Sequence, residues 1–164
     1  MAIKRLGMAA LLFVFLGFPL SAAMVSFMVV EVGLRQDASR SEYSSVWEDG
    51  MMGVFFDAGH IVSNSPVTRI EKISEGILPP EVQADYQDAW RGGADYFVLV
   101  LLEYALQGGV VRPQGALVKV FAARESSGNL IYEGRFAGTG SSLREESVRA
   151  QETARIIMNQ IKDR

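Results

Sequence analysis

Cysteine is absent from all 164 residues of this chain. Its absence excludes disulfide bonds, thiol catalysis, cysteine-based metal sites and lipid attachment at a signal-peptide cysteine. Histidine occurs once, as His60, so a metal site built from several imidazole ligands is excluded as well. Basic clusters are also missing and the net charge is −3, a poor basis for binding nucleic acid or an anionic membrane surface.

Two motifs of catalytic and phosphate-binding proteins are missing too. No serine lies in a G-x-S-x-G nucleophile elbow. Residues 138–142 (GTGSS) precede an amphipathic stretch and offer backbone N–H groups to an anion, but they lack the lysine and the spacing of a phosphate loop. We favour a hinge or helix cap here over an anion cradle, and we predict no bound cofactor and no metal.

The amino terminus has the pattern of an export signal. Lys4 and Arg5 form a basic start, residues 6–20 are apolar with Pro19 near their end, and residues 21–23 (SAA) are small. This order of basic, apolar and small residues is what a signal peptidase reads.

We therefore predict a signal peptide over residues 1–23, cleaved after Ala23, and a single exported, periplasmic domain over residues 24–164. The alternative is an inner-membrane anchor that is never cleaved, since residues 6–30 carry no charge and are long enough to cross a bilayer. Residues 24–32 continue with a β-type pattern, which favours cleavage.

A run of β-branched and aromatic residues at 94–104 (ADYFVLVLLEY) is the most strongly apolar stretch of the expected domain. It is entered through two glycines and followed by two more at 108–109. A run this short and this rich in β-formers predicts a strand that is covered on both faces, in the middle of a sheet.

The remaining pattern predicts an α/β (α+β) fold with a mixed five-stranded sheet, in the order β-α-β-α-β-β-β-α, and helices packed on it in two or three layers. The first three strands are expected to be parallel and the last three antiparallel. The expected strands are 25–34, 60–64, 94–104, 116–124 and 130–137, and the helices follow Ser41, Pro80 and Ser142.

Three further details belong to this prediction. Residues 67–77 are compatible with a strand continuation or a short helix, and both remain open. Residues 107–115 are expected to form a connection that contains glycine and Pro113. In the last helix, Ser142 and Glu145 have the spacing of a capping box, and Glu146 is expected to lie off the apolar stripe.

Residues 93–100 (GADYFVLV) resemble the "GADYVV" strand of bacterial envelope proteins: the TolB amino-terminal domain, the curli-secretion lipoprotein CsgG and LpoB-type activators. The likeness continues through residues 118–125 (VKVFAARE) and 127–134 (SGNLIYEG). It implies a periplasmic α/β accessory domain that binds other proteins, and it implies no family active site. The missing lipobox cysteine is a departure from many of these relatives.

Two groups of residues are candidates for catalytic chemistry. His60 with Asp57 has the composition of an oriented general base or a single metal ligand, but a hydrogen-bonded or solvent-facing histidine is favoured. Glu31 and Glu103 are expected on neighbouring strands, where they would form an acid/base pair if they met. Solvated strand ends are favoured, so a hydrolase is a less favoured alternative.

The first helix carries more large apolar side chains than one buried stripe needs. Core packing explains most of them, and any surplus left exposed would be a partner surface. We therefore expect a non-enzymatic domain in envelope assembly or maintenance that contacts an envelope protein or complex, with a small-ligand or anion carrier as the alternative. No nucleic acid partner is expected, and contact with membrane is expected only through an uncleaved signal. The candidate partner-surface residues are Trp47, Met51, Met52, Phe55 and Phe56.

Overall fold

A computed structural model describes residues 22–34, 41–74, 76–124, 126–138 and 142–162. Most of the predicted export signal and the glycine-rich residues 139–141 lie outside these ranges. No helix in the described part combines the length and apolarity needed to cross a bilayer.

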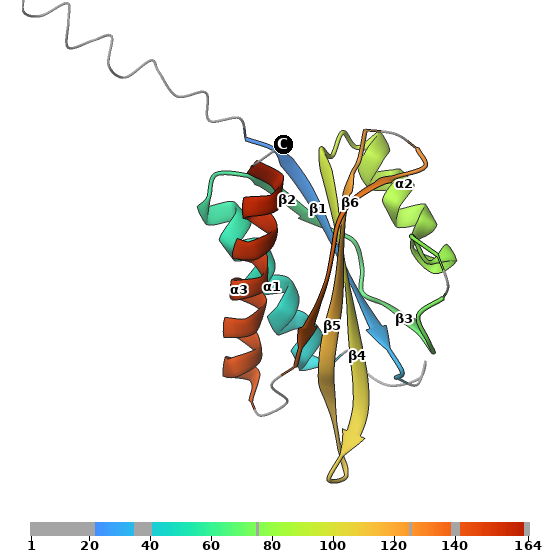
Figure 1. Ribbon diagram of the computed structural model, residues 1–164, viewed down its shortest axis with the longest axis vertical. Helices are drawn as coiled ribbons and strands as arrows, with labels where there is room; N and C mark the ends of the chain where they lie inside the picture. The colour runs from blue at the N-terminus through green and yellow to red at the C-terminus, as the bar shows by residue number, and fades with distance from the viewer. Residues whose placement is uncertain (1–21, 35–40, 75, 125, 139–141, 163–164) are drawn as a thin grey trace, which may run out of the picture.

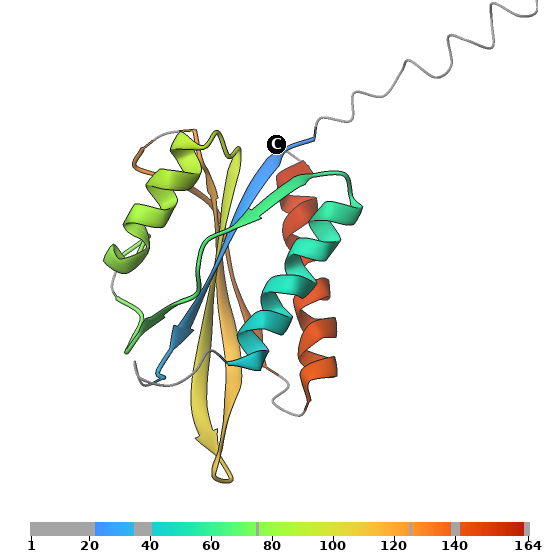
Figure 2. The same cartoon turned by 180° about the vertical axis from the view of Figure 1, so that it is seen from behind.

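One mixed sheet forms the middle layer, with α1 and α3 on one face and α2 on the other (Figures 1 and 2). Of the two layer arrangements left open by the sequence, the structure has three layers. The strands are β1 Met24–Val32, β2 Ile61–Asn64, β3 Thr68–Ile70, β4 Tyr96–Gln107, β5 Val110–Ala122 and β6 Asn129–Ala137. The helices are α1 Glu42–Asp57, α2 Gln83–Arg91 and α3 Leu143–Lys162, with a 3₁₀ turn at Pro80–Val82 before α2.

The strand order is β2-β1-β4-β5-β6, with β3 also paired to β1. As predicted, β1 is parallel to β2 and β4, while β4, β5 and β6 are antiparallel. The strand predicted over 94–104 is β4, and it lies at the centre with both faces covered. Val98, Val100 and Leu102 pack under α1 and α3, whereas their neighbours in the strand pack under α2.

The sheet has six strands, and the prediction of five is corrected. The additional strand is β3, inside the stretch left open between strand and helix. The chain runs along one edge of β1 in two pieces: β2 pairs with Met24–Phe27 and β3 with Val30–Val32. Between them Ser65 still donates its N–H to the Phe27 carbonyl at 2.9 Å, but Pro66 has no N–H and interrupts the ladder.

A second correction concerns the connection predicted over residues 107–115. There β4 and β5 continue as a long hairpin that turns at Gly108 and Gly109. Both glycines have positive φ, 57° and 84°, which is the conformation of a two-residue hairpin turn. Pro113 lies within β5, at a position where β6 no longer pairs with that strand.

The helices α1 and α3 cross closely at Gly50. A Cβ built on Gly50 would lie 3.0 Å from the Cβ of buried Ala150 and 3.3 Å from the Ser147 carbonyl oxygen. By contrast, a Cβ on Gly53, one turn later in α1, would meet nothing within 4 Å. The glycine at position 50 therefore serves the helix packing, and the one at position 53 does not.

We expect Gly50→Ala and Gly53→Ala to change stability in opposite directions. Gly53→Ala should stabilise the fold by about 1 kcal/mol through helix propensity alone. Gly50→Ala should destabilise it by about 1 kcal/mol, because overpacking at the crossing outweighs the same propensity gain. Urea unfolding of both variants measures the difference, and equal stabilisation by the two would contradict the close crossing.

Candidate functional site

The most connected polar group in the described part is the carboxylate of Glu31, near the carboxyl end of β1. Its side chain is fully buried. One oxygen accepts hydrogen bonds from the Ser41 backbone N–H at 2.8 Å and from the Ser44 hydroxyl at 2.7 Å. Ser41 is also the N-cap of α1, accepting from the Tyr43 N–H, so the carboxylate lies at the positive end of that helix.

The other oxygen of Glu31 accepts from Nε of Arg69 at 2.6 Å. The parallel register explains the pairing, because Glu31 on β1 lies directly opposite Arg69 on β3. The Arg69 side chain is only 13% exposed, so the ion pair is largely out of water. A buried carboxylate with a cation, a hydroxyl and a backbone donor is well satisfied.

Tyr104 extends the network from β4. Its hydroxyl lies 2.8 Å from the Ser44 oxygen, and since Ser44 donates to Glu31, Tyr104 is the donor in this contact. Burial raises the pKa of Tyr104 above its ordinary value of 10.0; the Ser41 and Ser44 hydroxyls act in the opposite direction, and the charges on Glu31 and Glu146 add to the rise.

We expect Tyr104→Phe to lose about 1 kcal/mol of stability at neutral pH, the worth of one buried hydrogen bond. The raised pKa means that the folded protein holds the phenol proton more tightly than the unfolded chain. The stability from neutral Tyr104 is therefore complete below pH 10 and falls as the pH rises toward the folded-state pKa. Urea unfolding from about pH 7 to 11 should show the gap between wild type and variant narrowing above the ordinary tyrosine pKa, and a constant gap would contradict the assignment.

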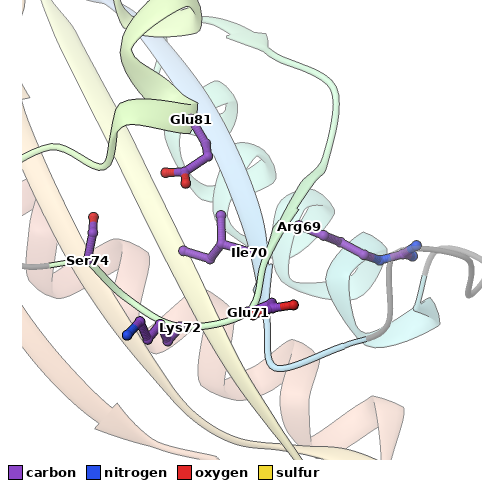
Figure 3. A pocket seen from close by; sticks show the side chains of 6 residues that line it. All are labelled: Arg69, Ile70, Glu71, Lys72, Ser74 and Glu81. Atoms are coloured by element: carbon purple, nitrogen blue, oxygen red, sulfur yellow. The ribbon is translucent and has the colours of Figure 1, made fainter.

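A hollow of about 430 Å³ lies beside this network, between the chain after β3 and the start of the 3₁₀ turn (Figure 3). The carboxylate of Glu81 points over the hollow toward Ile70, while Arg69 points away from it. The Ser74 hydroxyl is buried without a hydrogen-bond partner among the described residues. The lining residues are Arg69, Ile70, Glu71, Lys72, Ser74 and Glu81. Two cations and two acids leave the lining without a net charge to select an ion.

The acid/base pair considered for Glu31 and Glu103 does not form. In the register of β1 and β4, Glu103 lies opposite Val32, whereas Glu31 lies opposite Leu102. Side chains alternate along a strand, so the two carboxylates are on opposite faces of the sheet. Glu103 instead pairs with Arg135 at 2.9 Å on the surface.

His60 lies at the junction of α1 and β2. Its Nδ1 accepts the Ala23 backbone N–H at 3.2 Å, and its ring contacts Phe55. Asp57 lines a separate hollow of about 130 Å³ between α1 and α3, together with Arg155. Within the described ranges, no group of three or more acidic or histidine side chains is placed to hold a metal ion.

The structure separates the five candidate partner-surface residues of the first helix. Trp47, Met51 and Phe55 are fully buried under the sheet, so they offer no accessible surface, and Met52 is half-buried. Phe56 is 67% exposed. The sequence analysis missed Ile61, which is 55% exposed on β2. Its signal was available in principle, because a short strand at the end of a sheet order exposes side chains on both faces.

No protein-family model matches this chain, and no curated protein matches it. Among solved structures, it is similar to the PelC dodecamer from Paraburkholderia phytofirmans, with 12% identity, a TM-score of 0.48 and coverage of 85% of this chain and 88% of that chain. A hypothetical protein from Chlamydia trachomatis matches with 14% identity, a TM-score of 0.44 and coverage of 85% and 95%. These values assign neither a family nor a function, and the resemblance to the TolB, CsgG and LpoB families stays a prediction.

Proposed function

We propose that this chain is an exported, non-enzymatic accessory domain of the bacterial envelope that binds another protein along the β2 edge of its sheet. The observation that carries the proposal is the exposure of Phe56 and Ile61 on either side of the α1–β2 junction. The export pattern of residues 1–23 and the resemblance of residues 93–100 to envelope proteins support the compartment.

The β2 edge has the features that strand addition uses. In the described part β2 pairs only with β1, so its outer edge is open to a further strand. Val62 packs against the core cluster under α1, and Ile61, its neighbour in the strand, therefore faces the other side of the sheet. An added strand would meet Phe56 with one face and Ile61 with the other.

The test places a photo-crosslinking residue at Ile61 in cells that produce the protein, with Ile156 on α3 as a matched control. Ile156 is 44% exposed and far from β2 in sequence. We expect a discrete crosslinked partner at position 61, none at position 156, and loss of the product with Phe56→Glu. Amino-terminal sequencing of the fractionated protein checks export. Equal crosslinking at both positions, or none at position 61, would overturn the proposed edge.

The alternatives have less support. The hydrolase would need Glu31 and Glu103 on one face, and the register separates them. The anion carrier depends on residues 139–141, which lie outside the described ranges.

A further inference from the structure

The long hairpin formed by the ends of β4 and β5 extends beyond both helix layers (Figures 1 and 2). Pairing between β1 and β4 ends at Glu103, and pairing between β5 and β6 begins at Gly115. Residues 104–107 and 110–113 are therefore a two-stranded arm with both outer edges unpaired in the described sheet. We call residues 104–113 the arm.

The tip of the arm is apolar on both of its faces. Leu106 and Val111 are cross-strand partners and share one face, while Val110 shares the other face with Gln107. Leu106 is 70% exposed, and Val110 and Val111 are about half exposed. A protein groove or a second strand would cover one face or one edge. Apolar side chains on every side of a narrow tip match a medium that surrounds the tip.

Charge along the arm fits the same kind of partner. No charged residue occurs from Tyr104 to Val111, and the first one back along β5 is Arg112. At the base on β4, the charge of Glu103 is balanced by Arg135 at 2.9 Å. An apolar end followed by a single arginine matches a bilayer, in which acyl chains lie below a layer of headgroup phosphates.

We infer that the tip of this arm inserts into the interfacial region of a lipid bilayer, with Leu106, Val110 and Val111 below the phosphates and Arg112 at their level. From Arg112 to Val110 a strand advances about 7 Å, which is within the usual depth of interfacial insertion. The open backbone edges limit the depth, because unpaired N–H and C=O groups are not tolerated in the hydrocarbon core. Insertion is driven by the apolar tip, so it does not require anionic lipid despite the acidic chain.

The absence of cysteine allows a direct test with the full chain. A single cysteine at Gln107, Ile61 or Ile156 is labelled with the polarity-sensitive dye nitrobenzoxadiazole and mixed with phosphatidylcholine vesicles, with or without phosphatidylglycerol. We expect a blue shift at position 107 that brominated lipid quenches, and no change at 61 or 156. Position 61 is the key control, because it lies beside Ala23, at the opposite end from the arm, where an uncleaved signal would attach the domain to the membrane.

The tip variant Leu106→Gln/Val111→Gln, labelled at position 107, should need on the order of tenfold more lipid for the same shift. These side chains lie outside both core clusters, so folding should be unchanged by circular dichroism. A response at position 61 but not 107 would overturn the inference. So would a shift that depends on protein concentration without vesicles, which would assign the tip to a second copy, or one that needs anionic lipid and disappears in high salt.

Discussion

Arg69→Met should lower the free energy of unfolding by about 3–5 kcal/mol, one of the two largest losses we expect from a single substitution in this protein. The fully buried Glu31 carboxylate would keep its contacts with the Ser41 N–H and the Ser44 hydroxyl but lose its cation. An uncompensated charge in a low-dielectric interior is far less stable than the same charge in the unfolded chain.

The matched control is Arg135→Met, which removes the arginine from an ion pair of similar type on the surface. Arg135 and Glu103 are 65% and 37% exposed, and we expect a loss below about 1 kcal/mol. Adding Glu31→Gln to Arg69→Met should recover part of the loss, because it removes the buried charge. Urea unfolding of the wild type and these variants gives the values. Equal losses from the two arginine variants would show that Glu31 does not depend on its partner.

Trp47→Ala should be comparably destabilising, by about 3–5 kcal/mol. Trp47 is fully buried between α1, α3 and the sheet. Its indole N–H donates to the carboxylate of Glu146 at 2.8 Å, and Glu146 is itself fully buried. The substitution removes a large apolar contact area and one donor to a buried acid.

Trp47→Phe separates these two effects. Phenylalanine keeps most of the ring packing and removes the N–H, so the loss should be about 1–3 kcal/mol. Glu146→Gln provides the second side of a double-mutant cycle, because it removes the charge to which Trp47 donates. If Trp47→Phe costs the same stability in the wild type as in the Glu146→Gln background, the hydrogen bond contributes nothing and the ring packing explains the whole loss.

Glu146 also shows where reading the helix pattern fails. The apolar stripe of α3 was predicted correctly at Ala150, Ala154, Ile157 and Ile161, all of which are buried. The capping contact also forms, since the Ser142 hydroxyl accepts the Glu145 N–H at 3.3 Å. The charge of Glu146 predicts a position off the stripe. Its burial depends on Trp47, 99 residues earlier in the chain, and no local pattern reports that donor.

The buried polar network of the candidate site has the same origin. Glu31, Ser44, Arg69 and Tyr104 come from β1, α1, β3 and β4, and only the register of the sheet and the position of α1 bring them together. The strand β3 is three residues long and follows a proline, so its pattern was too short to distinguish from a helix turn. Without β3, the partner of Glu31 had no assigned place.

The sequence alone determined the central strand, the hairpins after it, the direction in which the strands pair and the helices that cover them. These features are local: apolar period, turn glycines and caps act between residues a few positions apart. Only the tertiary structure decided which acids are buried, which apolar residues of α1 stay exposed and how far the β4–β5 arm extends. Those depend on the lengths of neighbouring strands and on partners distant in the chain, and solvent exposure is a property of the whole packed molecule.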